Sequence, residues 1–181
     1  MKIVLIGIQG SGKSTQGNLL SEKLGVPYLS TGHIFRELAK EPGALGRYIK
    51  ETMNAGYLIP DAKTLEIVEE YLSRPEYKKG YILDGFPRTR RQAETFKNGL
   101  DAVIYIKVSD GEALHRLSIR NDERADEAQP ALKKRIELFH KFTEPVIDYY
   151  KELGLLHEIE GERPIEAIQK DISIVLNASV K

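Results

Sequence analysis

The sequence predicts an α/β fold in which about five parallel strands form a doubly wound sheet flanked by helices. Short apolar runs alternate with amphipathic stretches of helical length. The runs are rich in β-branched or aromatic residues, as in strands that are buried on both faces. No internal repeat or low-complexity linker divides the chain, and 181 residues suffice to bury a core. We therefore expect one domain spanning residues 1–181.

Four of the apolar runs predict strands, and a weaker run is a fifth candidate. They are Ile3–Ile6, Tyr81–Leu83, Ala102–Ile106 and Leu155–Ile159, with Pro27–Ser30 as the weaker one. The helical stretches are Lys13–Leu24, Asp61–Ser73, Arg90–Asn98, Asp110–Arg120, Pro130–Leu153 and Pro164–Leu176. Residues 31–60 contain helical patches but no run of strand length. They predict a helical insertion on the sheet, and such insertions often bind substrate.

The composition excludes several functional classes. The 27 basic residues balance the 27 acidic ones, so nothing indicates a surface for nucleic acid or for anionic lipid. The absence of cysteine excludes disulfides and cysteine-based metal sites. The apolar start of the chain is too short for a signal peptide, and no run approaches membrane-spanning length. These observations predict a cytoplasmic protein that does not associate with membranes.

Residues 7–14 match the pattern G-x-x-x-x-G-K-[ST] directly after a predicted strand. In this pattern backbone N–H groups surround phosphate oxygens, and the following helix directs its positive end at them. Lys13 would neutralise the β- and γ-phosphates, while the hydroxyl of Ser14 or Thr15 would reach magnesium. The pattern predicts an ATP site of the P-loop NTPase type, contacted by Gly10, Ser11, Gly12, Lys13, Ser14 and Thr15.

An acidic residue, Asp84, ends the apolar strand predicted at Tyr81–Leu83. Beside a P-loop, such a carboxylate holds magnesium directly or through its waters. We therefore expect a magnesium site at Ser14 and Asp84. The four histidines show no metal-ligand spacing, so no zinc is expected.

The sequence also contains many arginines near the predicted site segments. Phosphoryl transfer requires positioning and charge neutralisation more than covalent chemistry. An enzyme that joins two nucleotides should need arginines and no general base, because a phosphate acceptor is already ionised. The candidates are Arg36, Arg88, Arg116, Arg120, Arg124 and Arg135.

Six motifs resemble the adenylate kinase family along nearly the whole chain. They are Gly12-Lys13-Ser14-Thr15-Gln16, Ser30-Thr31-Gly32-His33-Ile34-Phe35-Arg36, Gly56-Tyr57-Leu58-Ile59-Pro60-Asp61, Asp84-Gly85-Phe86-Pro87-Arg88-Thr89 with Gln92, Arg124-Ala125-Asp126 with Arg135, and Thr143-Glu144-Pro145-Val146-Ile147-Asp148-Tyr149-Tyr150. The resemblance implies reversible transfer from ATP to AMP, giving two ADP, with magnesium.

The same resemblance implies a role for each matched residue. The AMP site would comprise Thr31, Arg36, Ile59, Gly85, Arg88 and Gln92, with Thr31 and Gln92 reading the adenine. The residues around the transferring group would be Lys13, Arg88, Arg120, Arg124 and Arg135. Arg116 would stack on the ATP base, Asp84 would order magnesium waters, and Asp126 would orient the loop or its arginines.

The chain departs from the family pattern at three places. His33 stands where the family has an aspartate, and Ser14 stands where it has a glycine. The lid, at about residues 120–127, has only three residues between Arg120 and Arg124. So short a lid implies either loose selectivity for the ATP base or help from a neighbouring subunit. A monomer and a small homo-oligomer both remain open.

Two other functions remain open. A kinase for UMP, CMP or another nucleoside monophosphate would share the chemistry, although Thr31 and Gln92 favour AMP. A non-catalytic P-loop switch protein belongs to a different class. The acceptor-side set Arg36, Arg88 and Gln92 argues against it, because a switch would not need these residues.

Overall fold

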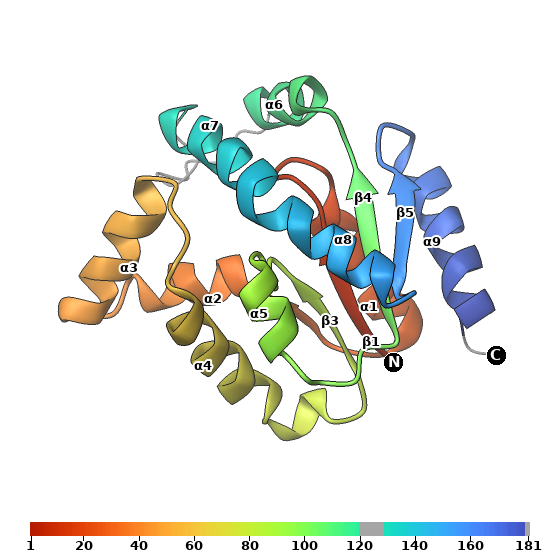
Figure 1. The fold of residues 1–181 in the computed structure, drawn as a ribbon, viewed down its shortest axis with the longest axis horizontal. Coiled ribbons are helices and arrows are strands. Elements are labelled where there is room, and N and C mark those ends of the chain that lie inside the picture. The colour runs from red at the N-terminus through yellow and green to blue at the C-terminus, as the bar shows by residue number, and fades with distance from the viewer. Residues whose placement is uncertain (120–128, 180–181) are drawn as a thin grey trace.

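The computed structural model describes residues 1–119 and 129–179. Five parallel strands form one sheet in the order β2-β3-β1-β4-β5 (Figure 1). The strands are β1 (Lys2–Ile6), β2 (Tyr28–Ser30), β3 (Tyr81–Asp84), β4 (Ala102–Lys107) and β5 (Leu156–Glu160). The predicted α/β class and all five predicted strands are therefore confirmed, with ends that differ by about one residue.

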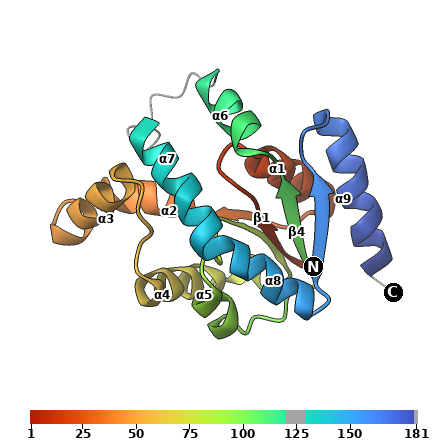
Figure 2. The ribbon, with the colours of Figure 1, turned by 45° about the horizontal axis from the view of Figure 1, so that its top comes forward.

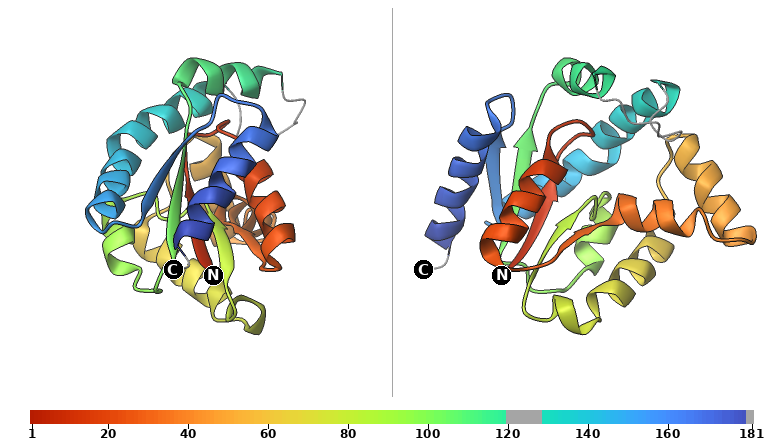
Figure 3. Two further views of the ribbon diagram at one scale, coloured as in Figure 1. Left: turned by 90° about the vertical axis from the view of Figure 1, so that its right-hand side faces the viewer. Right: turned by 180° about the vertical axis from the view of Figure 1, so that it is seen from behind.

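Helices cover both faces of this sheet, and Figure 3 shows the sheet edge-on between them. The α-helices are α1 (Lys13–Leu24), α2 (Thr31–Leu38), α3 (Ala44–Asn54), α4 (Asp61–Leu72), α5 (Arg90–Thr95), α6 (Asp110–Ser118), α7 (Gln129–Leu138), α8 (Glu144–Glu152) and α9 (Ile165–Ser179). A 3₁₀ turn lies at Pro75–Tyr77, and a π-helical turn at Phe139–Thr143 joins α7 to α8. Within the described residues, no helix is both long and apolar enough to cross a membrane.

The three central strands, β1, β3 and β4, are almost continuously apolar because each one faces two cores. In β1, Ile3 and Leu5 pack toward α1 and α9, whereas Val4 and Ile6 pack toward α2, α4, α5 and α8. All four side chains are at most 3% exposed. Side chains alternate between the faces of a strand, so a strand covered on both faces must be apolar at every position. The β1 backbone is thereby held rigidly, and the P-loop follows directly from it.

The segment 31–60 folds into α2 and α3 and contains no strand, as predicted. Ile49 and Met53 of α3 are at most 8% exposed and join the core beside α2. Figures 1 and 2 show α3 at the periphery of the molecule, with α7 passing between α3 and α6. This arrangement places α2 and α3 beside the carboxyl ends of β1 and β3.

The stretch predicted to be helical, Pro130–Leu153, is helical from Gln129 to Glu152, but it is not one regular α-helix. The structure has α7, the π-helical turn and α8 in its place. Pro145 lacks an N–H group, and its ring would clash with the carbonyl of Lys141 in a regular helix. The backbone widens by one residue immediately before this proline, and Thr143 becomes buried at the widened turn.

The predicted helix Arg90–Asn98 also ends early, at Thr95. Phe96 leaves the helical conformation with ψ 89° and is only 5% exposed. Its ring packs edge-on to that of Phe86, at a centroid distance of 5.0 Å. Burial of this aromatic side chain, which stabilises by about 1.5–3 kcal/mol, outweighs one further helical turn. The helix predicted at Asp110–Arg120 ends at Ser118, and Arg120 lies outside the described residues.

Candidate active site

A pocket of about 640 Å³ opens at the carboxyl ends of β1 and β3. The P-loop forms its floor, and its walls come from α2, residues 57–59, residues 84–88, α6, α7 and the start of α9. Ligands of doubly wound sheets bind in the crevice at the carboxyl ends of the strands, where neighbouring strands connect in opposite directions. The pocket occupies that place in this fold.

The P-loop turns through two glycines in the left-handed conformation. Gly10 has φ +90° and Gly12 has φ +91°, a region that L side chains rarely adopt. A Cβ atom at Gly10 would also lie 2.6 Å from the carbonyl oxygen of Ala113 on α6. Glycine is therefore required at this position. Gly12 is the N-cap of α1, so the loop backbone and the positive end of the helix face the same pocket.

Lys13 reaches back across the loop. Its Nζ donates to the carbonyl oxygens of Gly7 at 2.8 Å and Ile8 at 2.9 Å, and lies 3.5 Å from Ser11 Oγ. Burial lowers the pKa of the Lys13 ammonium, the Asp84 carboxylate opposes that shift, and Arg88 adds to it. The loop carbonyls thus hold a cation at the floor of the pocket, where an anionic ligand would meet it.

Asp84 ends β3 and is only 6% exposed, yet its carboxylate lines the pocket. The Tyr28 hydroxyl donates to Asp84 Oδ2 at 2.6 Å, and Ser14 Oγ donates to the same oxygen at 3.5 Å. Burial raises the pKa of the Tyr28 phenol well above its usual value, and the charge of Asp84 adds to this effect. The Tyr28 hydroxyl therefore remains a proton donor to the carboxylate.

Three arginines converge on the other wall of the pocket. Arg36 comes from α2, Arg88 follows β3, and Arg135 comes from α7. The pKa of Arg88 is lowered to about 10, mainly by burial; the charges of Arg135 and Arg36 also lower it, and the charge of Asp84 opposes the shift. Repulsion among three cations in one cavity is relieved when an anion binds, so this wall favours phosphate.

Hydrogen bonds fix the loop that carries Arg88. Its Nε donates to the carbonyl oxygen of Gly85 at 2.8 Å, and its own carbonyl accepts from Thr143 Oγ1 at 2.9 Å. Gly85 has φ +83°, and a Cβ atom there would lie 2.5 Å from Thr31 Oγ1. Glycine is thus required where the loop passes Thr31. The guanidinium of Arg88 is held in place before any ligand arrives.

Gln92 is 2% exposed, and both ends of its amide are engaged. Its Oε1 accepts from the backbone N–H of Arg88 at 2.7 Å, and its Nε2 donates to Asp61 Oδ1 at 2.8 Å. The partners fix the orientation of the amide, because a backbone N–H needs the oxygen and a carboxylate needs the NH₂ group. One N–H and one lone pair remain for a ligand in the pocket.

The two other residues expected at the acceptor end, Ile59 and Thr31, differ in their position relative to the pocket. Ile59 lines the pocket and is 5% exposed. Thr31 is 1% exposed, and its hydroxyl donates to the carbonyl oxygen of Asp84 at 3.2 Å. His33 is exposed at the start of α2, where its N–H donates to the capping Ser30 Oγ. Neither Thr31 nor His33 belongs to the described pocket lining.

Known proteins are similar in sequence to this chain over nearly its whole length. The family model for adenylate kinase matches residues 5–155. Adenylate kinases of Methanocella arvoryzae and Archaeoglobus fulgidus are 36% and 34% identical, each over 97% of this chain and 98% of the relative. That of Bacillus velezensis is 34% identical over all of both chains. The chain belongs to the adenylate kinase family. It is therefore a phosphotransferase by descent, as the motifs predict.

The alignment with the Bacillus velezensis adenylate kinase runs over 217 positions, although this chain has 181 residues. The chain therefore lacks residues that this longer family member has. Three residues with expected roles, Arg120, Arg124 and Asp126, and the whole predicted lid at residues 120–127, lie outside the described residues. Their roles remain predictions.

Several residues of this adenylate kinase site were not found from the sequence. Tyr28 and Asp61 hold Asp84 and Gln92, respectively. Gln9 Oε1 accepts from Arg135 Nη1 at 2.8 Å, which connects the P-loop to α7. Asp61 ends a recognised motif, so its acidic character offered a signal. Tyr28 and Gln9 offered none, because each acts through a partner far away in the sequence.

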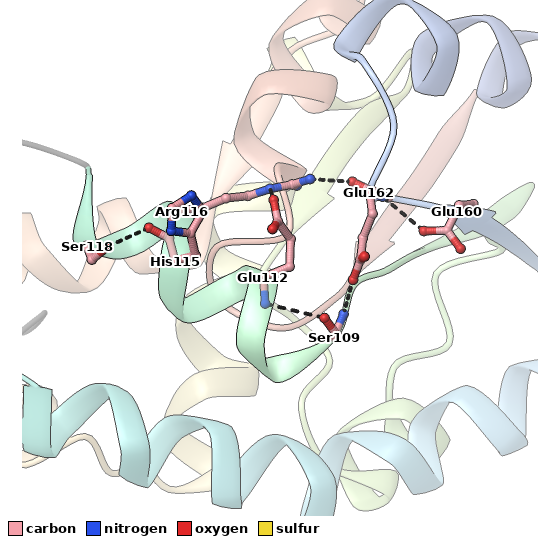
Figure 4. A network of polar contacts seen from close by, with 8 residues as sticks. Ser109, Glu112, His115, Arg116, Ser118, Glu160 and Glu162 are labelled. Atoms are coloured by element: carbon pink, nitrogen blue, oxygen red, sulfur yellow. Dashed lines mark hydrogen bonds and ion pairs between the residues drawn. The ribbon is translucent and has the colours of Figure 1, made fainter.

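Arg116, the residue expected to stack on the ATP base, belongs to a polar network between α6 and the loop after β5 (Figure 4). Its Nε donates to Glu112 Oε1 at 2.6 Å, and its Nη2 donates to the carbonyl oxygen of Gly161 at 2.9 Å. The N–H of Ser109 donates to Glu162 Oε1 at 2.8 Å, so the loop is tied to α6 twice. The guanidinium is thereby oriented along the pocket wall.

Replacing Glu112 by glutamine removes the charge that orients Arg116. We expect the KM for ATP to rise about threefold to fivefold, because a partly exposed ion pair contributes up to ~1 kcal/mol. The KM for AMP should not change, since Glu112 contacts Arg116, the residue expected at the ATP base. Steady-state kinetics with each nucleotide varied in turn measures both values.

Glu94→Gln is the matched control, because Glu94 pairs with Arg90 Nε at 2.7 Å on the exposed side of α5. It should leave both KM values unchanged. Equal changes of the two KM values in Glu112→Gln would contradict an orienting role for Glu112 at the ATP base.

His140 joins α6 to α8. Its Nδ1 lies 2.6 Å from Glu144 Oε1, and its Nε2 lies 3.0 Å from both carboxylate oxygens of Asp110. The hydrogen bond to Glu144 raises the pKa of His140, burial opposes the shift, and Asp110 adds to it. The imidazolium therefore bridges α6, which precedes the segment 120–128, and the first turn of α8.

This bridge predicts pH-dependent stability. The pKa is higher in the folded state, so the contribution is fully present below the unfolded pKa near ~6.5 and is lost as the pH rises through the folded pKa. The side chain is 43% exposed, so the contribution should be about 1 kcal/mol or less. Urea unfolding of His140→Gln should show a larger loss at about pH 6 than at about pH 8.5. The exposed His115→Gln is the control, and an equal loss at both pH values would contradict the bridge.

Proposed function

We propose that the chain catalyses reversible phosphoryl transfer from ATP to AMP, forming two ADP. One observation carries this proposal: a single pocket is lined both by the P-loop and by Arg36, Arg88 and Gln92. A site for one nucleotide would need only the loop. The cationic wall opposite the loop provides a second phosphate site within the same cavity, so two nucleotides can meet end to end.

The donor end would hold ATP through Gly10, Ser11, Gly12, Lys13, Ser14 and Thr15. Backbone N–H groups at the start of α1 would bind the phosphates, with Lys13 moving from the loop carbonyls to the β- and γ-phosphates. Arg116 would stack on the base, which suits a planar guanidinium whose Nε and Nη2 are already bonded to Glu112 and Gly161.

The acceptor end would hold AMP. Arg36 and Arg88 would clamp its phosphate, while Ile59 and the Gly85 backbone lie beside its base. Gln92 would read the adenine edge with the N–H and lone pair that Asp61 and Arg88 leave available. The Thr31 hydroxyl donates to the Asp84 carbonyl, which leaves its oxygen as an acceptor, and its direct role in reading the base remains a prediction.

Transfer then needs alignment and charge neutralisation. The phosphate of AMP is ionised at neutral pH, so no base has to remove a proton. Lys13, Arg88 and Arg135 lie around the position of the transferring group, and Arg120 and Arg124 would complete the arginine cage with Asp126 orienting them. Each cation stabilises negative charge on the equatorial oxygens as the group moves between the two nucleotides.

The residues at the end of β3 fit magnesium. The carboxylate of Asp84 and the hydroxyl of Ser14 are hard oxygen donors that both line the pocket. Magnesium prefers one or two carboxylates together with phosphate oxygens and water. Among the described residues no cluster of three or more His, Asp or Glu side chains could hold a metal. Asp84 and Ser14 would hold the ion, directly or through water, and the ion would neutralise phosphate charge.

The remaining organisation is proposed from the sequence and the family. Residues 1–181 would form one kinase domain, with residues 31–60 as the monophosphate-binding insertion. The length that the chain lacks relative to its longer relative would be missing from the lid at residues 120–127. The protein would act in the cytoplasm as a monomer or small homo-oligomer.

Incubation of the protein with ATP, AMP and Mg²⁺ tests this proposal. We expect two ADP to form for each AMP consumed, and ADP alone to return ATP and AMP. Tight binding of ATP without transfer to any nucleoside monophosphate would support the P-loop switch in place of the kinase.

A further inference from the structure

The Asp84 carboxylate is held by a residue that no motif includes. The Tyr28 hydroxyl donates to Asp84 Oδ2 at 2.6 Å, whereas Ser14 Oγ reaches the same oxygen only at 3.5 Å. Hydrogen bonds from a hydroxyl to an ionised carboxylate are short and about twice as strong as neutral ones. Tyr28 is therefore the main constraint on Oδ2 among the side chains around it.

The fold fixes the Tyr28 ring from two sides. In the parallel pairing of β2 with β3, Tyr28 lies opposite Ile82 and Ser30 lies opposite Asp84. Tyr28 and Ser30 are two residues apart, so their side chains share the face of the sheet that α1 covers. On that face a Cβ atom at Gly17 of α1 would lie 2.4 Å and 2.7 Å from two atoms of the Tyr28 ring. Glycine at this helical position makes room for the ring.

This packing restricts the direction in which the Tyr28 hydroxyl can point. The ring lies between α1 and the sheet, and α1 is the helix that begins in the P-loop with Ser14. Tyr28 thus connects the helix after the loop to the acid at the end of β3. Carboxylates that face a metal are oriented by hydrogen bonds from residues around them, and losing such a bond typically costs about 10–100-fold in metal affinity or activity.

We propose that Tyr28 is a positioning residue of the magnesium-dependent step: with its ring held against Gly17, its hydroxyl orients the Asp84 carboxylate toward magnesium-bound ATP. This inference rests on the proposed function. It assigns to Tyr28 no contact with either nucleotide, since its hydroxyl bonds to Asp84 and Tyr28 is not part of the described pocket lining.

Tyr28→Phe tests the proposal, because it keeps the ring against Gly17 and removes only the hydroxyl. Calorimetry should measure the affinity for a non-hydrolysable ATP analogue, with the β,γ-bridging oxygen replaced by nitrogen, in Mg²⁺ and in a chelator. We expect the metal-free affinity to remain within about twofold and the gain from Mg²⁺ to fall about tenfold. The Mg²⁺ concentration for half-maximal turnover should rise in parallel.

Tyr81→Phe is the matched control. Tyr81 is a buried tyrosine at the start of β3, and its hydroxyl has no hydrogen-bond partner in the described structure. Its removal should leave both affinities unchanged. Gly17→Ala is a second variant that keeps the Tyr28 hydroxyl but displaces the ring, and it should reduce the Mg²⁺-dependent gain as Tyr28→Phe does.

Two results would overturn the proposal. Unchanged magnesium dependence in Tyr28→Phe would show that Asp84 needs no such orientation. Equal losses with and without Mg²⁺ would show a general distortion of the pocket. Wild-type protein that transfers no phosphoryl group, or gains no affinity from Mg²⁺, would instead count against the proposed function, so the two failures are distinguishable.

Discussion

Replacement of Lys13 by methionine should lower kcat by about 10²–10³-fold, the range found when one preorganised donor to developing charge is removed. Methionine has a similar length but cannot neutralise a phosphate. The lysine already lies at the floor of the pocket, 2.8 Å and 2.9 Å from the carbonyls of Gly7 and Ile8, so it needs only a short movement to meet the β- and γ-phosphates.

Steady-state ADP formation measures this effect, and Lys2→Met is its control. Like Lys13, Lys2 donates to a backbone carbonyl, that of Asn98 at 2.8 Å, but it begins β1 and lies at the opposite end of that strand from the pocket. Its loss should leave kcat within about twofold. A Lys13→Met protein that folds normally and turns over at the wild-type rate would rule out the P-loop as the donor site.

Arg88→Ala should lower kcat/KM for AMP by about 10²–10³-fold, because removing a buried charged partner typically costs about 2–5 kcal/mol. Among the described residues, the Arg88 guanidinium donates only through Nε, to the carbonyl oxygen of Gly85. The terminal nitrogens are thus available for a phosphate. The KM for ATP should change little, since the proposed ATP site lies at the other end of the pocket.

Arg90→Ala is the matched control for Arg88. Arg90 lies two residues further along the chain but is exposed and pairs with Glu94. Its removal should leave the AMP kinetics unchanged. Equal losses toward AMP and ATP in Arg88→Ala, together with a lower unfolding midpoint, would show that Arg88 holds the loop and does not bind the acceptor phosphate.

Much of the fold could be predicted from the sequence because its signals are local. The apolar strand at Ile3–Ile6 and the helix at Lys13–Leu24 follow from residue type, spacing and the glycine punctuation around them. The π-helical turn between α7 and α8 could not be found by periodicity, since Pro145 keeps its place in the helical pattern. The early end of α5 depends on Phe96 meeting Phe86, which is a tertiary contact.

The site residues also fall into two groups, those that sequence motifs predict and those whose roles depend on tertiary contacts. The P-loop, Asp84, Arg88 and Gln92 stand in contiguous motifs, and the structure brings them to one pocket. Tyr28 and Gln9 were missed because their roles depend on residues 56 and 126 positions away. Sequence reasoning also gave Thr31 a direct role at the adenine, while in the structure its hydroxyl is bonded to the Asp84 carbonyl. Such pairings arise only when distant strands and helices pack.

The acceptor specificity tests the central claim most directly. With ATP and Mg²⁺ held constant, kcat/KM should be measured for AMP, UMP, CMP and GMP in turn. We expect AMP to exceed each of the others by at least about 10²-fold, because the buried Gln92 amide must leave polar groups unpaired beside a wrong base. Comparable values for UMP or CMP would contradict the assignment of AMP as the acceptor and would favour a kinase for another nucleoside monophosphate.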